Sequence, residues 1–488
     1  MDSTTAVSSP IDAPLPPDAN EELAGPPREL APVNRKERIS SLDVLRGFAL
    51  LGILMVNIDD FSGPESLHDI PVGVGKPALT GPHAHLNLIV LLLKWMFIEN
   101  KMRGLFSVLF GAGVILFTRR SDRGAEKSAD TYHRRNMWLM VLGAVHGTLI
   151  WSGDILLMYG MNALLVLYPL RKLKPRTLLI AGTAVWVGLT VLAYLIFFHG
   201  FDSFALRRKA AVVTAEQRAG KTLTVEDKKT LEQWKLVQAP MHIWVRTPAP
   251  VAIDPAKIQE DIKAKTSGYF ARLKEEGTEF FSRTFMIVAL GASLDTIGAM
   301  LVGMALFKNG FLTAELPFGT YALTAVIGFL ISIPLTVFAI LKAYAAGFSV
   351  LALNEWIFTT QYTSTEAGVL AIAATILMMC KTGFFRPLLR PFAAVGQTAL
   401  SNYLLTSILC QWIFCFGPLK LYGQLEYYQA VFVVFAVWAI NLTISPLWLL
   451  AFEFGPCEWL WRSLTYWKLQ PMRRSRQEKL AATAVFQA

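Results

Sequence analysis

The chain has 488 residues, of which 53% are hydrophobic and 17% are charged, whereas a typical soluble domain has about 25% charged residues. Its net charge of +10 would favour nucleic-acid binding in a soluble protein. However, the cations fall mostly in short linkers and tails, and no arginine-rich helix with interleaved aromatic residues lies outside the apolar segments. Composition therefore argues against nucleic acid as a partner. It predicts an all-α, polytopic integral membrane helix bundle, in which each span needs about 20 apolar residues.

The cysteines Cys380, Cys410, Cys415 and Cys457 lie in or beside apolar segments. Their spacing matches neither a zinc site nor a disulfide framework, and buried cysteine commonly acts as a small hydrophobic residue. We therefore expect no metal site.

The N-terminal segment, residues 1 to 38, is rich in Pro, Ala, Ser and acidic residues and has no apolar core. This composition predicts a disordered cytoplasmic tail and not a cleavable signal peptide. The first predicted span, Leu42 to Ile58, follows Arg35, Lys36 and Arg38. Positive residues ahead of a first span favour a cytoplasmic N-terminus.

The next apolar stretch, from Leu86 to Phe117, is interrupted by charged residues near its middle. If both apolar halves crossed the membrane, the six lysines and arginines from Arg119 to Arg135 would lie outside, against the positive-inside rule. We therefore expect one crossing at about 104 to 118. Residues 84 to 98 then form an interfacial or re-entrant helix on the outer side.

The same rule predicts about ten crossings in two groups of five. The first group occupies residues 39 to 199, and the second occupies residues 283 to 472. After the two crossings already described, the expected helices are 136 to 151, one that returns to Arg171, 177 to 199, 284 to 306, 318 to 343, 366 to 381, 392 to 416 and 429 to 452.

Between the groups lies a long polar insertion, residues 200 to 282, which we expect to be extracytoplasmic, with solvated helices at Thr222 to Val237 and Pro255 to Glu276. Residues 344 to 363 fit either an outer amphipathic segment or part of a broken helix. The basic tail, residues 473 to 488, is expected to be cytoplasmic and close to anionic membrane lipids.

Asp43 and Arg46 lie three residues apart at the inner end of the first span, so one helical turn brings their side chains together. One interpretation is an ion pair at a capped helix end. The other is a cytoplasmic polar pocket that holds an anionic substrate.

His146 lies in an otherwise apolar helix just before Trp151, and Asp154 follows in the next turn. A carboxylate beside an imidazole fixes its tautomer and raises its basicity, which suits a general base. The alternative is a buried structural histidine, with Asp154 as the N-cap of the following helix.

Further polar residues lie within or at the end of predicted spans. Asn57 lies at the outer end of the first span, and the loop residue His68 follows that span. Loop polarity alone explains the neighbouring Asp59 and Asp60. Asp295 needs a partner, which we expect on another helix. Asn402 and Tyr403 either bind substrate or join helices.

Several motifs, in this order, resemble the YeiB-like family of bacterial membrane proteins (domain of unknown function 418). The resemblance covers almost everything from Arg38 to Met472 apart from the insertion, and its motifs are Ser41 to Asn57, Leu105 to Gly113, His146 to Tyr159, Val395 to Leu404 and Phe454 to Tyr466. It implies a multi-pass protein of the bacterial inner membrane with both termini in the cytoplasm.

The Asp-x-x-Arg-Gly sequence beginning at Asp43 is also similar to that of transmembrane acyltransferases, including the acyltransferase-3 family and heparan-alpha-glucosaminide N-acetyltransferase. These enzymes transfer an acyl group from cytoplasmic acyl-CoA to an acceptor on the far side. The acyltransferase-3 pattern would place a catalytic histidine at position 57, where this chain has Asn57. The pattern of the heparan-modifying enzyme would place it at His68.

The resemblance therefore implies acyl-CoA as donor near Asp43 and Arg46, and an envelope glycan or lipid as acceptor. In this hypothesis His146 and Asp154 are catalytic, with His68 as a further candidate. Substrate-binding candidates are Asn57, Trp151, Asp295, Asn402 and Tyr403. Two alternatives stay open: a transporter that uses Asp295, His146 and Asp154 as a proton relay, and a scaffold whose insertion binds a partner.

Overall fold

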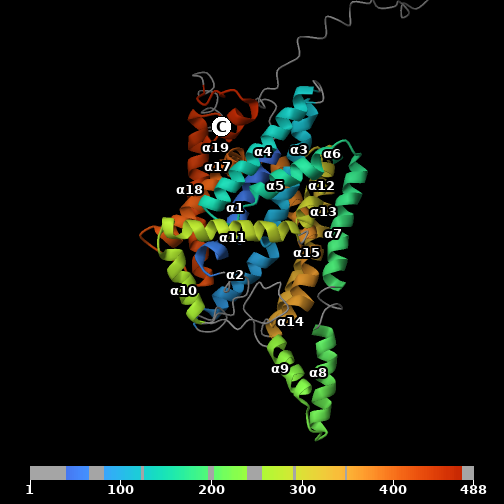
Figure 1. Ribbon diagram of the computed structural model, residues 1–488. Coiled ribbons are helices and arrows are strands. Elements are labelled where there is room, and N and C mark those ends of the chain that lie inside the picture. The colour runs from blue at the N-terminus through green and yellow to red at the C-terminus, as the bar shows by residue number, and fades with distance from the viewer. Residues whose placement is uncertain are drawn as a thin grey trace, which may run out of the picture.

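The computed structural model describes residues 40–64, 82–121, 126–195, 203–238, 255–289, 293–346 and 349–474. Within these ranges the chain is almost entirely helical (Figure 1). An isolated antiparallel β-bridge joins Phe452 to Arg473. The all-α fold is therefore confirmed. Most of both tails, and His68 with them, lies outside the described residues.

Seven helical segments in the described part of the chain are long and apolar enough to cross a membrane: Ser40–Ser62, Ala84–Arg119, Pro175–Leu192, Phe318–Ala345, Glu355–Thr382, Ala399–Phe416 and Tyr427–Ala451. The chain is thus a polytopic membrane protein. Ten crossings, and the two-group division of the chain, stay predictions.

The first half consists of α1 (Ser40–Ser62), α2 (Ala84–Phe97), α3 (Lys101–Ser121), α4 (Glu126–Leu149), α5 (Leu156–Asn162), the π-helical η4 (Ala163–Leu167), α6 (Tyr168–Leu170) and α7 (Pro175–Tyr194). Helix α1 extends past Ile58, so Asp59 belongs to the helix and not to a loop. Helix α2 has 14 residues and buries Asn87, Leu91 and Lys94. A short turn separates it from α3, and the interfacial placement of residues 84 to 98 stays a prediction.

The insertion contains α8 (Ser203–Arg218), α9 (Val225–Gln238), α10 (Pro255–Thr266) and α11 (Tyr269–Ala289). In Figure 1, α8 and α9 form a hairpin that projects from the bundle, whereas α11 crosses its surface near α4. The expectation of one solvated helix over Pro255 to Glu276 is wrong. The segment forms two helices, and Arg272 and Glu276 are each only 4% exposed because Glu276 accepts hydrogen bonds from Arg272 and from the backbone N–H of Ser152.

The second half consists of α12 (Leu294–Lys308), α13 (Phe318–Ala345), α14 (Val350–Ala352), the π-helical η6 (Leu353–Phe358), α15 (Thr359–Thr382), α16 (Arg386–Gln397), α17 (Ala399–Gln411), the π-helical η7 (Trp412–Phe416), α18 (Tyr427–Ala451) and α19 (Pro456–Tyr466).

Three of these differ from the predicted boundaries. The crossing expected at 284 to 306 is instead two helices, because α11 ends at Ala289 and α12 begins at Leu294. Most of residues 344 to 363 is helical and leads into α15, which favours the broken-helix interpretation. The expected helix 392 to 416 is interrupted at Thr398, between α16 and α17.

Close contacts between backbones hold the bundle together. A Cβ on Gly396 of α16 would lie 1.8 Å from the carbonyl O of Asp43, and one on Gly111 of α3 would lie 2.0 Å from the carbonyl O of Met300 on α12. Small residues permit such approach between membrane helices. The contact of α1 with α16 sets the position of Asp43 and Arg46.

Cations gather where α1 begins. Lys308 donates to the carbonyl oxygens of Arg171 and Leu173, both at 2.7 Å, and Lys381 donates to that of Ala314 at 2.8 Å. We call this the cationic end of the bundle. It contains α19, whereas the α8–α9 hairpin projects from the opposite end (Figure 1), which we call the insertion end.

Candidate active site

His146 and Asp154 form a buried pair. His146 lies in the last turn of α4, and its Nδ1 is 2.8 Å from Oδ2 of Asp154. The side chains of the two residues are 1% and 0% exposed. An ionised carboxylate only accepts hydrogen bonds, so Nδ1 carries the proton and Nε2 is left as the acceptor. Within the described part of the chain, Nε2 is buried and has no hydrogen-bond partner.

Asp154 also caps the start of the following helix, which is the alternative role that the sequence left open. Its Oδ1 accepts a hydrogen bond from the backbone N–H of Leu157 at 3.0 Å, which satisfies a free donor at the start of α5. Gly143 makes room for this turn, because a Cβ there would lie 2.7 Å from Oδ1 of Asp154. One carboxylate therefore fixes both the helix start and the histidine.

Two aromatic residues predicted from the sequence enclose this pair. The ring of Tyr403 on α17 is 4.9 Å from the His146 ring, and the ring of Trp151 is 6.4 Å from it. Trp151 in turn packs on Phe61 of α1, with 4.4 Å between ring centroids. Asn57 lies one helical turn before Phe61, on the same side of α1. The surroundings of the imidazole are thus largely apolar.

A cavity of about 260 Å³ extends from the neighbourhood of this pair to the cationic end. It is lined by residues of α1, α3, α4, α5, α16, α17 and α19. Tyr403 and Ile155 line it close to His146, and Asp43 and Arg46 line it on α1. His146 is not among the lining residues, whereas Tyr403, whose ring contacts the His146 ring, is. Ligand pockets commonly measure about 300–1,000 Å³, so this cavity suits a slender ligand or part of a larger one.

Three arginines line the cavity: Arg46, Arg135 and Arg462. Arg46 donates to Asp43 at 3.1 Å and to the carbonyl O of Gly396 at 3.2 Å. The Arg135 guanidinium lies 3.7 Å from the ring centroid of Trp461 and forms no ion pair within the described residues. Burial, and then the charges of Arg462 and Arg46, lower the pKa of Arg135 to about 10. A bound anion would relieve this repulsion.

The carboxylates of the cavity are already engaged. Asp43 pairs with Arg46, so the ion-pair interpretation is observed, and the same pair lines the cavity of the pocket interpretation. Glu458 of α19 accepts hydrogen bonds from the backbone N–H groups of Leu400 and Ser401 at 2.5 and 3.1 Å. Burial raises the pKa of Glu458 above its ordinary value despite these bonds.

Other predicted site residues lie elsewhere or serve the fold. Asp295 pairs with Arg103 of α3 at 2.8 Å, so its partner is on another helix, as expected. This pair lines a separate, smaller cavity. Asn402 exchanges hydrogen bonds with Ser445 at 2.8 and 3.1 Å and so joins α17 to α18. Asn57 is half-buried.

Arg135 and Arg462 are not predicted from the sequence, because residues so far apart in the chain meet only in the fold. The attribution of Asp59 to loop polarity is wrong. Asp59 is buried in α1 and pairs with Lys94 of α2, which is 3% exposed. A lysine within an apolar segment is costly, and this was the signal that could have identified Lys94.

Comparisons with known proteins place the chain among its relatives. Residues 306–468 match the model of a family described as "Protein of unknown function (DUF418)". The chain is 29% identical over 460 residues to the uncharacterized protein YxaH of Bacillus subtilis, covering 91% of this chain and 98% of that protein. It is 28% identical over 440 residues to the uncharacterized protein YeiB of Escherichia coli, covering 88% and 96%.

Residues 306–468 thus match the DUF418 family, and nearly the whole chain is similar to the YeiB-like proteins. The names of these relatives assign no activity to them, and no solved structure matches the chain. The activity must therefore be argued from the geometry of this YeiB-like protein itself.

Proposed function

We propose that this YeiB-like protein is a membrane acyltransferase that moves an acyl group from acyl-CoA to an acceptor on the other side of the membrane. One observation carries the proposal: a single cavity joins three arginines at the cationic end to Tyr403, whose ring contacts His146. Such a cavity can hold an anionic donor at one end and bring its acyl group at the other end to Tyr403, beside the proposed general base His146.

The donor site is the arginine cavity. Guanidinium groups bind phosphate through paired hydrogen bonds, so Arg46, Arg135 and Arg462 suit the phosphates of coenzyme A. Beyond them the lining becomes apolar, with Phe106 and Phe110 of α3. The cavity volume of about 260 Å³ suits the slender thioester arm, with the nucleotide remaining at the cationic end.

In the reaction, Nε2 of His146 takes the proton from an acceptor hydroxyl or amine, and the acceptor atom attacks the thioester carbonyl carbon. The C–S bond breaks as the new acyl bond forms. The thiolate of coenzyme A leaves and takes the proton back from His146, so protons and electrons balance. Asp154 stabilises the transient imidazolium, and the Asn57 amide is the proposed donor to the developing oxyanion.

The proposed orientation follows the distribution of charge. The short linkers and helix ends near Lys308, Lys381 and Arg462 carry cations, and the positive-inside rule, which counts short loops, assigns such an end to the cytoplasm. In the inner membrane of a bacterium, acyl-CoA would then enter from the cytoplasm. The acceptor would be an envelope glycan or lipid on the side of the insertion.

The test is transfer from radiolabelled acetyl-CoA and octanoyl-CoA into envelope material, in membrane vesicles that carry the native chain or His146→Ala. The matched control is His133→Gln, since His133 lies on the same helix but is exposed. We expect transfer with the native chain and the control, and none with His146→Ala. Equal transfer with His146→Ala would refute the proposal.

A transporter is the second candidate, and one observation favours it. The smaller cavity at Asp295 reaches Ser107, whose Oγ is 2.6 Å from the hydroxyl of Tyr159 in the arginine cavity. A single hydrogen bond thus separates two cavities. However, Asp295 pairs with Arg103 and not with the His146–Asp154 pair, which weakens the predicted proton relay. Solute uptake into proteoliposomes without any acyl donor would favour transport.

A further inference from the structure

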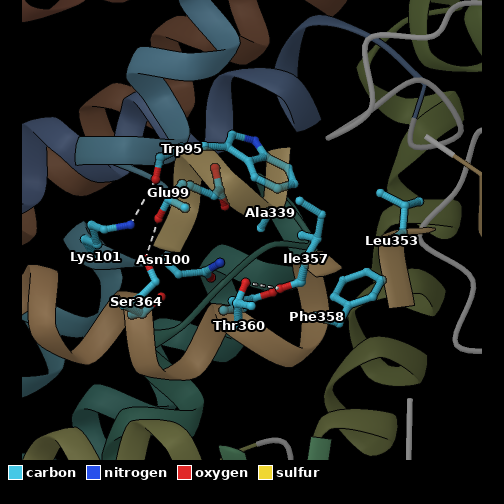
Figure 2. A pocket seen from close by; sticks show the side chains of 13 residues that line it. Trp95, Glu99, Asn100, Lys101, Ala339, Leu353, Ile357, Phe358, Thr360 and Ser364 are labelled. Atoms are coloured by element: carbon cyan, nitrogen blue, oxygen red, sulfur yellow. Dashed lines mark hydrogen bonds between the residues drawn. The ribbon is translucent and has the colours of Figure 1, made fainter. Parts of the chain in front are cut away.

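A further cavity, of about 50 Å³, lies between the turn that joins α2 to α3, helix α13 and the helix formed by η6 and α15. Figure 2 shows Glu99, Asn100 and Lys101 beside it, with Trp95, Ile357 and Phe358 around them. We call it the Lys101 cavity. It has a polar side, from the turn and α15, and an apolar side.

Two polar groups of this cavity have no hydrogen-bond partner among the described residues. Lys101 is only 2% exposed. Its Nζ donates to the carbonyl O of Trp95 at 2.9 Å, and Lys101 forms no ion pair within the described residues. Glu99 Oε2 and Trp95 Nε1 are buried without hydrogen-bond partners there. A buried polar group without a partner is unfavourable, and native proteins usually fill such sites with water or ligand.

Two features of the backbone hold these groups in place. Asn100 has φ of 55°, a left-handed conformation that asparagine adopts more readily than most residues. Gly368 on α15 leaves room for the Lys101 chain, since a Cβ there would lie 2.6 Å from Lys101 Cε. The neighbouring charges Lys94 and Arg103 already pair with carboxylates.

We propose that the Lys101 cavity binds the hydroxyl-bearing end of a polyol or sugar. A hydroxyl group both accepts and donates hydrogen bonds. The hydroxyls of a polyol can therefore accept hydrogen bonds from Lys101 and from Trp95 Nε1 and donate one to Glu99. The apolar side, with Ile357 and Phe358, would contact the carbon atoms of the same ligand.

The size and charge of the cavity narrow the ligand class. About 10–15 Å³ of such a cavity holds one water, so about 50 Å³ suits one or two hydroxyl-bearing carbons and not a whole sugar ring. A zwitterion such as glycine could also bridge Lys101 and Glu99. It would bring two further charges into a buried site, whereas a neutral polyol brings none, and buried charge is expensive.

The Lys101 cavity also lies on a route to the donor site. It shares Asn100, Gln361 and Thr365 with the smaller cavity at Asp295, which ends at the Ser107–Tyr159 hydrogen bond. If the polyol is the acyl acceptor, this route would bring it toward the arginine cavity. That identification rests on the proposed function, whereas polyol binding itself does not.

The test is binding of radiolabelled glycerol to the full chain in lipid nanodiscs prepared without glycerol. We expect saturable binding by the native chain and loss of that binding in Lys101→Met and Glu99→Gln. Lys342→Met should bind like the native chain, because Lys342 is an exposed lysine on α13 outside the cavity. Thermal unfolding of each variant shows that it is folded, and Thr365→Ser supplies a milder change in the same cavity if either fails to fold.

No saturable binding by the native chain, equal binding by Lys101→Met, or displacement of glycerol by equimolar glycine would overturn the proposal. Binding of coenzyme A is measured in the same samples. Loss of glycerol binding with intact coenzyme A binding in Lys101→Met separates this site from the donor site. Failure of acyl transfer in the His146 experiment leaves the glycerol result standing on its own.

Discussion

The arginine cavity and the Lys101 cavity differ in how their charges are balanced. In the arginine cavity, Arg135 has no ion-pair partner among the described residues, and both carboxylates are engaged by the protein. In the Lys101 cavity, a buried lysine and a carboxylate oxygen without a hydrogen-bond partner among the described residues line the same space, and the volume is much smaller. The first therefore suits an anion with a long apolar arm, and the second a small neutral ligand. Each of the following changes should affect one cavity and spare the other.

The largest expected effect is on chemistry beside the arginine cavity. Asp154→Asn should lower acyl transfer by about 10²–10⁴-fold, because the amide no longer enforces the tautomer of His146. The fold should persist, since asparagine is also a good N-cap. The measurements are the transfer rate, coenzyme A affinity and glycerol affinity. Unchanged transfer in folded Asp154→Asn would argue against His146 as the base.

Arg135→Ala should weaken binding of coenzyme A by roughly 10–100-fold, because a hydrogen bond to a charged group contributes about 1.5–3 kcal/mol. Isothermal titration in nanodiscs measures the affinity. The control is Arg134→Ala, whose side chain lies over Trp467 and outside the cavity. Equal losses in both variants would point to a general electrostatic effect and not to a site.

Gly396→Ala should destabilise the bundle by about 1–3 kcal/mol, because overpacking forces α16 away from α1. A Cβ at this position would lie 1.8 Å from the carbonyl O of Asp43. Coenzyme A binding should fall, while glycerol binding should not. Gly188→Ala is the matched control: its Cβ would meet nothing within 4 Å. A native-like melting temperature for Gly396→Ala would contradict the packing.

The smallest effect concerns α11, which lies over the turn that precedes Asp154. Burial alone would raise the pKa of Glu276, but the charges of Lys265 and Arg272, with their hydrogen bonds, outweigh it and lower the pKa below 4.5. The carboxylate therefore stabilises this contact fully above pH 4.5 and loses that contribution as the pH falls through its lowered pKa.

We therefore expect hydrogen exchange at the amide of Ser152, which donates to Glu276, to become faster relative to the amides of α4 when the pH falls below 4.5. In Glu276→Gln this acid-dependent increase should disappear. An identical acid response in the variant would show that another group loosens α11.

The sequence predicted those parts of the site that are local in the chain. His146 and Asp154 are joined by one turn, and Asp43 and Arg46 by one turn of helix, so spacing was enough. Arg135 and Arg462 meet only because α19 packs on α4, and no local pattern shows this. The error at Asp59 has a similar cause: its partner Lys94 is on another helix.

The helix boundaries likewise divide into those that the local sequence predicts and those that depend on tertiary contacts. Long apolar runs such as α13 and α18 are clear from hydropathy alone. The break at Thr398 and the helix that includes residues 353 to 358 depend on contacts with neighbouring helices, and a hydropathy pattern does not contain these contacts.

The most direct test of the central claim is photocrosslinking of the native chain with an acyl-CoA analogue that carries a diazirine on its acyl chain, followed by mass spectrometry of the labelled peptides. The account predicts labels on the α5 and α17 segments that contain Ile155 and Tyr403. Excess coenzyme A should suppress these labels, and Arg135→Ala should diminish them. Labels on the segment from Trp95 to Lys101 instead, or none that coenzyme A suppresses, would contradict it.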